Sequence, residues 1–231
     1  MKEYIENQIK NAKLIMKPFP HLIVDNLIPE KDFIELKEEI SKLTDFEQFT
    51  IHEGRFSITD DKWTNNLCNL RKELYNEDIK NLLKEKFKEQ LMKREEFHSK
   101  ADWKLHLSVD KNYYEIPPHL DSPTKQLSVL FYLFGSDVGT SLYTNNHKGI
   151  EEMDYKKAKK IGEVQFVENR LFVFCASIFD RTWHGVEKSK KEQKRFVIQG
   201  YLELIKRPKI KWDSWGKYSI RDSLPKRTDK Y

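Results

Sequence analysis

Hydrophobic and polar residues alternate along the second half of the chain, and this two-residue period limits what that half can fold into. Trp103, Leu105, Leu107 and Val109 share one face of an extended segment, because successive side chains of a strand point to opposite faces. The pattern occurs in four segments, 103–109, 126–134, 170–177 and 195–204. Polar turns separate these segments, so the pattern predicts an antiparallel sandwich or barrel.

The first hundred residues mainly show the spacing of helices. Phe33, Leu36 and Ile40 recur every three or four positions, which predicts an amphipathic helix, and a charged helix is expected over 3–15. Residues 18–29 carry prolines at both ends and β-branched residues between them, which predicts a strand. We expect a single domain over 1–231 with three parts, a mostly helical region over 1–100, a β core over 101–205 and an extension over 206–231.

Basic residues are concentrated at the C-terminal end. The chain holds 42 Lys and Arg against 37 Asp and Glu, a formal charge of +5, and residues 206–231 alone contribute nine basic and three acidic side chains. The remaining body is therefore nearly neutral and does not favour a nucleic-acid partner, which needs a strongly basic folded surface. The extension also holds Trp212, Trp215 and Tyr218. We expect it to stay solvated, to fold over the core or to engage an acidic partner.

The sequence predicts neither a membrane span nor an export signal. No apolar run approaches the roughly 20 residues of a membrane helix, and the N-terminal segment is charged. Cys68 and Cys175 are the two cysteines, and neither belongs to a zinc-binding spacing, which argues against a disulfide framework or a zinc finger. We expect a cytoplasmic protein without a membrane partner, and the sequence leaves its oligomeric state open.

A His-x-Asp motif follows the first predicted strand. His119 and Asp121 are two positions apart, so an extended backbone places both side chains on one side, and the two prolines before His119 favour that conformation. His184 follows the predicted strand 170–177 and supplies a second histidine. Two histidines and one carboxylate form the facial triad that binds non-haem iron(II) and leaves neighbouring positions open. Each histidine alone is also consistent with a hydrogen-bonded core residue.

Arg195 opens the last predicted strand, eleven residues after His184. Its planar guanidinium is suited to pairing with a carboxylate. If the side chain faces the interior, it needs either water or an anion beside it, because an isolated buried charge loses its hydration. We expect a bound dicarboxylate to supply that anion. Lys194 is the alternative cation, and Arg195 is also consistent with a basic surface cluster.

The order and spacing of these four residues resemble those of the iron(II)/2-oxoglutarate-dependent dioxygenases, especially the prolyl-hydroxylase-like branch. The resemblance extends from His98 to Leu204, and the segment 18–29 followed by a helix is similar to the N-terminal entry of that branch. It implies an α+β, mainly β fold. In such a fold, N-terminal helices pack against a double-stranded β-helix core of the jelly-roll, cupin-like type.

The resemblance also implies a role for each matching residue. His119, Asp121 and His184 would bind Fe(II) and form the catalytic centre. Arg195 would pair with the distal carboxylate of 2-oxoglutarate, the co-substrate, and Tyr132 would donate its hydroxyl to the same group. The implied enzyme is a hydroxylase that consumes O2, releases succinate and CO2, and uses ascorbate as a reductant.

Other functions remain open at this point. A jelly-roll module that binds a metal or a polyanion without oxygenase activity would keep the two histidines, and a zinc hydrolase would use them with a metal-bound water. Neither alternative requires Arg195. Tyr132 is equally consistent with an ordinary sheet aromatic. The other histidines are predicted not to be ligands, namely His21, His52, His98, His106 and His147.

The substrate is not specified by the sequence. Candidates for lining the entrance are the residues next to the ligands in sequence, Tyr113, Ser122, Arg181 and Trp183. These side chains are compatible with a peptidyl residue, a free amino acid, a sugar or another small molecule.

Overall fold

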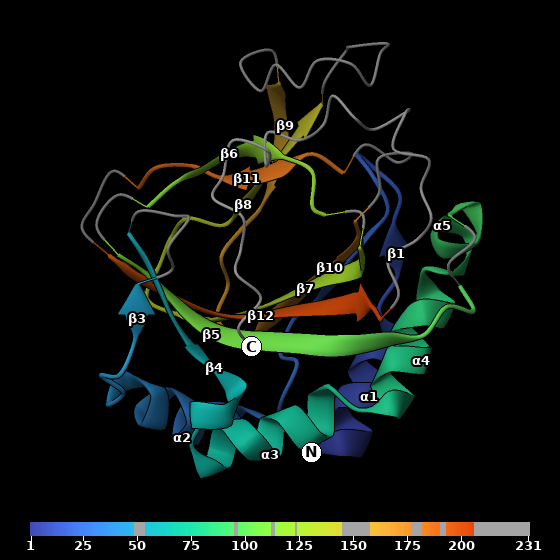
Figure 1. Cartoon of the computed structure of the whole chain (residues 1–231). Coiled ribbons are helices and arrows are strands. Elements are labelled where there is room, and N and C mark those ends of the chain that lie inside the picture. The colour runs from blue at the N-terminus through green and yellow to red at the C-terminus, as the bar shows by residue number, and fades with distance from the viewer. Residues whose placement is uncertain are drawn as a thin grey trace.

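The computed structural model describes the segments 1–48, 54–94, 97–111, 114–122, 124–144, 158–176, 182–189 and 193–205. The extension over 206–231 and the candidate residues Tyr113 and Arg181 lie outside the described residues. Within the described part, two β-sheets face each other, and helices cover the outer face of the larger sheet (Figure 1). The prediction of a mainly β fold packed by N-terminal helices is confirmed at this level.

Every strand pairing between the described strands is antiparallel. The larger sheet has the order β1-β2-β10-β7-β12-β5-β4-β3, and the smaller sheet has the order β6-β11-β8-β9. The strands of the larger sheet are β1 (Leu14–Ile15), β2 (His21–Val24), β3 (Glu47–Gln48), β4 (Arg55–Thr59), β5 (Ala101–Lys111), β7 (Lys125–Phe134), β10 (Arg170–Cys175) and β12 (Lys194–Leu204). The strands of the smaller sheet are β6 (Ile116–His119), β8 (Thr140–Thr144), β9 (Lys159–Val164) and β11 (His184–Val186). The four segments with a two-residue period therefore became the four central strands of the larger sheet.

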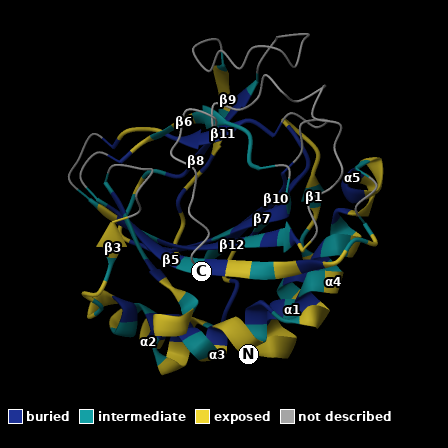
Figure 2. Cartoon of the chain, in the orientation of Figure 1, coloured by how far each residue is buried: buried dark blue, intermediate teal, exposed yellow. Residues whose placement is uncertain are grey.

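Helices form the second layer on the larger sheet. They are α1 (Lys2–Asn11), α2 (Glu30–Ser41), α3 (Asn65–Leu74), α4 (Glu77–Lys86) and α5 (Lys88–Lys93), with a short 3-10 helix at Asp60–Lys62. Their buried faces point at the sheet, and their exposed faces point away from it (Figure 2). None of the helices in the described segments is long and apolar enough to cross a membrane.

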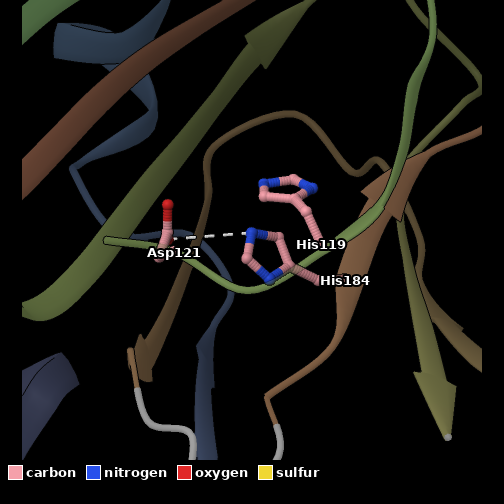
Figure 3. A group of neighbouring side chains, drawn as sticks. All are labelled: His119, Asp121 and His184. Carbon is pink, nitrogen blue, oxygen red and sulfur yellow. Dashed lines mark ion pairs between the residues drawn. The ribbon is translucent and has the colours of Figure 1, made fainter. Parts of the chain in front are cut away.

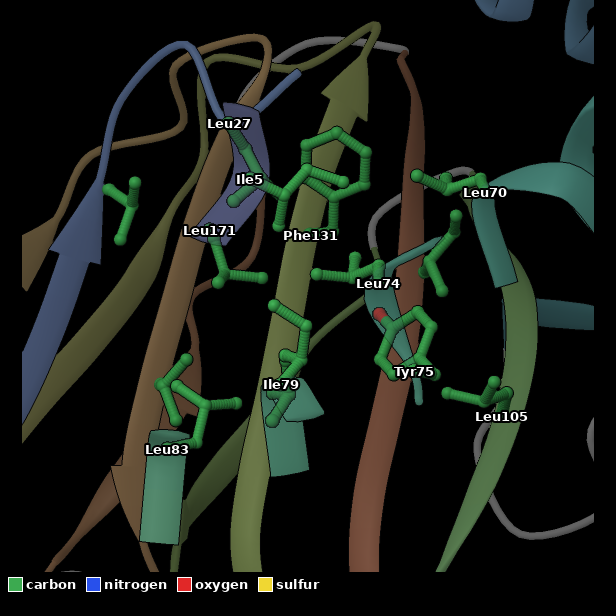
Figure 4. Packing of buried hydrophobic residues seen from close by; sticks show 14 of the residues in the cluster. Ile5, Leu27, Leu70, Leu74, Tyr75, Ile79, Leu83, Leu105, Phe131 and Leu171 are labelled. Atoms are coloured by element: carbon green, nitrogen blue, oxygen red, sulfur yellow. The ribbon is translucent and has the colours of Figure 1, made fainter. Parts of the chain in front are cut away.

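The main hydrophobic core lies between these helices and the larger sheet. Helix residues Leu74, Ile79 and Leu83 belong to one buried cluster with strand residues Phe131 and Leu171 (Figure 4). Complete burial of one such side chain contributes about 1.5–3 kcal/mol of transfer free energy. This layer holds the larger sheet in place and so fixes the residues on its opposite face.

A second, smaller cluster lies between the two sheets. Strand β7 is buried on both faces, which explains the nearly continuous apolar run of the sequence there. Val129 and Phe131 face the helices, whereas Tyr132 faces the smaller sheet. The members of this inner cluster are Phe19, Tyr132, Leu142, Val164, Phe166, Phe172, Phe174 and Val197. Aromatic side chains thus fill part of the space between the sheets.

The first hundred residues hold short strands as well as helices. They contribute β1, β2, β3 and β4 to the larger sheet, in addition to the helices. The helix expected over 3–15 ends at Asn11, and the strand expected over 18–29 is confined to His21–Val24. Asn26 shortly after that strand has a φ of 50°, a left-handed conformation that cannot continue a strand. These short strands lie at the two margins of the sheet, where local sequence gives little periodicity.

Candidate metal centre

Three side chains with metal-ligating atoms come together at one edge of the smaller sheet. His119 ends β6, His184 begins β11, and the two residues are directly opposite each other in the antiparallel ladder. Asp121 follows His119 by two positions. Figure 3 shows the three side chains pointing toward one another, and their ligand atoms all lie within 4.8 Å of one another. Strand β6 is an edge strand, which tolerates the two prolines before His119 because their missing N–H groups need no ladder partner.

Both histidine rings are held in the same tautomer. Nδ1 of His119 donates to the Pro117 carbonyl and Nδ1 of His184 donates to the Thr182 carbonyl, each over 2.9 Å. A carbonyl accepts only, so each Nδ1 carries the hydrogen and each Nε2 keeps its lone pair. This is the usual arrangement of metal-binding imidazoles, whose second nitrogen is anchored by an outer hydrogen bond.

Burial keeps the two imidazoles neutral. It lowers the pKa of His119 to about 3, with the neighbouring His184 adding to the effect, and it also lowers the pKa of His184. His184 is 7% exposed, and its ring lies 4.3 Å from that of His119 and 4.5 Å from that of Phe174, measured between centroids. Neutral imidazoles can bind a cation without first releasing a proton.

Asp121 supplies the negative charge of the group. Its Oδ2 lies 3.7 Å from Nε2 of His184 and accepts a hydrogen bond from the Ser128 hydroxyl, and its Oδ1 accepts one from the Lys125 ammonium at 2.6 Å. Burial alone would raise the pKa of Asp121, but the Lys125 charge and the two histidines overcome it and hold that pKa below its usual range. Lys125 also lies 3.5 Å above the ring centre of Tyr201. The carboxylate is therefore ionised and fixed in orientation from β7.

Arg195 faces the space between the sheets, but it already has an anionic partner. Its Nη1 donates to Oδ2 of Asp110 at 2.8 Å and its Nε donates to the Val138 carbonyl at 3.1 Å. The protein's own Asp110 therefore supplies an anion beside the buried Arg195, where the sequence leads us to expect a bound dicarboxylate. The guanidinium is 2% exposed, and its Nη2 has no hydrogen-bond partner among the described residues. Lys194, the alternative cation, is exposed.

Tyr132 lies beside Arg195. The Arg195 Cζ atom is 5.4 Å from the centre of the Tyr132 ring, and the Tyr132 hydroxyl forms a hydrogen bond of 2.6 Å with the Thr140 hydroxyl. Phe166 stacks on the Tyr132 ring at a centroid distance of 4.9 Å. Tyr132 is completely buried, which raises the pKa of its phenol and keeps it protonated as a donor. The structure thus places Arg195 and Tyr132 side by side between the two sheets.

The candidate substrate residues are only partly described. Ser122 is half-buried beside Asp121, and its hydroxyl is 2.9 Å from that of Thr124. Trp183 is buried beside His184, with 6% of its surface exposed. Tyr113 and Arg181 fall outside the described segments, so the structure brings neither into the site.

The remaining described histidines lie apart from the candidate metal centre. His106 is within 2.9 Å of the Gln199 amide, His21 is buried among Phe19 and Phe172, and His98 is exposed. Over the described residues, the group of His119, Asp121 and His184 is the one set of three such residues with converging ligand atoms. His52 and His147 lie outside the described residues.

Reasoning from the sequence missed two charged residues next to Arg195, namely Asp110 and Arg55. Asp110 sits at the end of a strand with alternating apolar residues, so a charged residue on the inner face was the signal that could have drawn attention to it. Arg55 carried no local signal, because its partner is 55 positions away in sequence.

Comparisons with known proteins identify the fold. No protein-family model matches the sequence, and no curated protein matches it. Among solved structures, a prolyl 4-hydroxylase from Pseudomonas putida is similar with a TM-score of 0.53 and 14% identity, over 89% of this chain and 100% of that one. An oxidoreductase of the 2OG-Fe(II) oxygenase family from Burkholderia pseudomallei gives 0.51 and 10% identity, over 87% of this chain and 90% of that one.

A third similar structure was solved with ligands. HygX from Streptomyces hygroscopicus, with nickel, 2-oxoglutarate and hygromycin B bound, gives a TM-score of 0.52 and 9% identity, over 80% of this chain and 83% of that one. These identities are low, and the likeness lies in the arrangement of the backbone. The chain therefore has the fold of the iron(II)- and 2-oxoglutarate-dependent oxygenases, and prolyl 4-hydroxylases are among its structural relatives.

Proposed function

We propose that this protein is a non-haem iron(II)- and 2-oxoglutarate-dependent oxygenase that hydroxylates a peptidyl residue or a small molecule. The observation that carries the proposal is the convergence of two neutral imidazole Nε2 atoms and one ionised carboxylate in a single site. Two histidines and one carboxylate occupy one face of an iron(II) ion and leave positions for further ligands. Fe(II) bound there would couple the oxidation of 2-oxoglutarate by O2, with release of succinate and CO2, to hydroxylation of the substrate.

The fold supports this proposal in its finer detail. From β5 to β12, successive strands alternate between the larger and the smaller sheet, except for β8 and β9, which are neighbours in the smaller one. Such alternation is expected of a double-stranded β-helix, or jelly-roll, and we assign these eight strands to one. This jelly-roll core would then occupy the middle and C-terminal part of a single domain.

The residues around the metal centre have distinct roles under this proposal. Lys125 and Ser128 hold the Asp121 carboxylate, so that its orientation does not depend on the metal. Arg195 would bind the distal carboxylate of 2-oxoglutarate through its unpartnered Nη2, and Tyr132 lies close enough to contribute a second donor. An unsatisfied buried donor is costly, so a carboxylate at this point supplies a partner that the described protein atoms do not.

The proposed substrate class rests on the structures to which this fold is similar. One similar structure is a prolyl 4-hydroxylase and another has hygromycin B bound. A peptidyl or a small polar substrate is therefore part of the proposal, without a choice between them. Ascorbate as a reductant belongs to the same proposal.

Succinate release tests the proposed function. Purified protein supplied with Fe(II), 2-oxoglutarate, ascorbate and air should form succinate slowly even without its substrate, because the co-substrate alone completes the iron site. The rate should fall to that of protein-free buffer when O2 is removed or when Fe(II) is omitted. Absence of any succinate above buffer, in protein that retains its metal, would favour a metal-binding module or a zinc hydrolase.

A further inference from the structure

Three charged side chains form a row across the inner face of the larger sheet. Asp110 on β5 lies directly opposite Arg55 on β4 and directly opposite Arg195 on β12. Arg55 donates to Asp110 twice, from Nε to Oδ1 at 2.6 Å and from Nη2 to Oδ2 at 2.9 Å. Arg195 donates from Nη1 to the same Oδ2 at 2.8 Å. One carboxylate is thus shared between two guanidinium groups.

The charges of this row do not balance. Arg55, Asp110 and Arg195 are 6%, 3% and 2% exposed. Burial alone would raise the pKa of Asp110, but the two arginines overcome it and keep that pKa below its usual range, so the row carries a net charge of +1. Within the described segments, Asp110 is the one carboxylate paired with either guanidinium. A buried net charge is unfavourable unless an anion compensates it, and one bound carboxylate would do so.

The two arginines differ in the donors that they leave free. Arg55 has a protein partner for each of its three guanidinium nitrogens. Its Nε and Nη2 donate to Asp110. Its Nη1 donates at 2.6 Å to the Gln199 amide oxygen when that amide is oriented with its oxygen toward Arg55. The Tyr114 ring also covers its Cζ at 4.3 Å. Arg195 has an unpartnered Nη2 among the described residues. A ligand would therefore meet Arg195, whereas Arg55 acts on it through Asp110.

We propose that Arg55 is a positioning and specificity residue that, through Asp110, orients Arg195 and leaves the site around Arg195 with a single net positive charge. This inference rests on the proposed function and deepens it, because it states why the site around Arg195 takes a keto acid with one distal carboxylate. Without Arg55, the Asp110–Arg195 pair is neutral. Asp110 would then repel an incoming carboxylate and compete with it for the donors of Arg195.

Ligand binding to charge variants tests the inference. Protein loaded with Mn(II), which occupies the metal centre without turnover, is titrated calorimetrically with 2-oxoglutarate and with 2-oxobutyrate, which lacks the distal carboxylate. We expect Arg55→Gln to weaken 2-oxoglutarate by at least about tenfold, the effect of losing one charge-assisted interaction. Binding of 2-oxobutyrate should change by less than about threefold. A residue that only stabilised the fold would weaken both ligands alike.

A double variant separates charge from shape. Arg55→Gln combined with Asp110→Asn restores the net charge of +1 on Arg195, so 2-oxoglutarate affinity should return to within about threefold of wild type. If Arg55→Gln alone fails to fold, as judged by loss of Mn(II) binding, the double variant alone tests the inference. Its loss of preference for 2-oxoglutarate over 2-oxobutyrate would overturn the inference.

The outcomes distinguish this inference from the proposed function. A wild-type protein that binds 2-oxoglutarate, together with an Arg55→Gln variant that binds it equally well, overturns the role of Arg55 and leaves the proposed function standing. A wild-type protein that holds Mn(II) but shows no preference for 2-oxoglutarate overturns both. The expected pattern is a preference lost in the single variant and regained in the double variant.

Discussion

Replacement of His184 by alanine should empty the metal centre. The substitution removes one of the two Nε2 donors and leaves Asp121 and His119, which cannot hold the same three-ligand face. Loss of an outer-shell partner alone costs about 10–100-fold in metal affinity, so loss of a ligand should cost at least about 100-fold. After dialysis against metal-free buffer, elemental analysis should find one divalent ion per wild-type chain and almost none in the variant.

His106 offers a matched control for the replacement of His184. His106 lies on the inner face of β5 near Gln199 and is not part of the converging group. His106→Ala should therefore retain the metal at the wild-type level while removing the same number of ring atoms. Thermal unfolding should first show that both proteins are folded. Equal metal content in wild type and His184→Ala would then contradict the assignment of the ligands.

Arg195→Ala should weaken 2-oxoglutarate far more than Tyr132→Phe does. The first variant removes the guanidinium that offers an unpartnered Nη2, and the second removes one hydroxyl that can bond Thr140 instead. Hydrogen bonds to charged groups contribute about 1.5–3 kcal/mol, so we expect at least about a tenfold loss against a few-fold loss. Calorimetric titration of the Mn(II)-loaded proteins measures both.

The fold should survive the loss of Arg195, because Asp110 keeps both of its bonds to Arg55. Metal binding by Arg195→Ala should remain close to wild type. Lys194→Ala serves as the control, since this exposed neighbour on the same strand is expected to leave the affinity unchanged. If instead Lys194→Ala weakened the co-substrate and Arg195→Ala did not, the distal carboxylate would have to be reassigned to Lys194.

The long strands of this fold could be predicted from the sequence, because alternation of apolar and polar residues is a local signal. Strand β5 covers the alternating segment 103–109, and β7 covers a run in which one face meets the helices and the other meets the inner cluster. The short strands of the smaller sheet lacked such a signal. Strand β11 has three residues, and β6 has four, of which two are prolines, so neither is long enough for an alternating pattern to stand out in the sequence.

The candidate site was predictable to the extent that its residues are close in sequence or match a known spacing. His119 and Asp121 are two positions apart, and their common side follows from an extended backbone. The row through Asp110 was not predictable, because it depends on the register of three strands whose residues are far apart in the chain. A shift of one residue in either register would turn the charged side chain to the opposite face.

Anaerobic titration of the Fe(II)-loaded protein with 2-oxoglutarate tests most directly whether this site is an oxygenase centre. A 2-oxo acid that chelates Fe(II) through its keto and carboxylate oxygens gives a weak visible charge-transfer band, which neither component shows alone. We expect the band to grow to saturation at one equivalent of 2-oxoglutarate per chain and to be absent from His184→Ala. Saturable binding of both Fe(II) and 2-oxoglutarate to the wild-type protein without this band would contradict the proposed chelate.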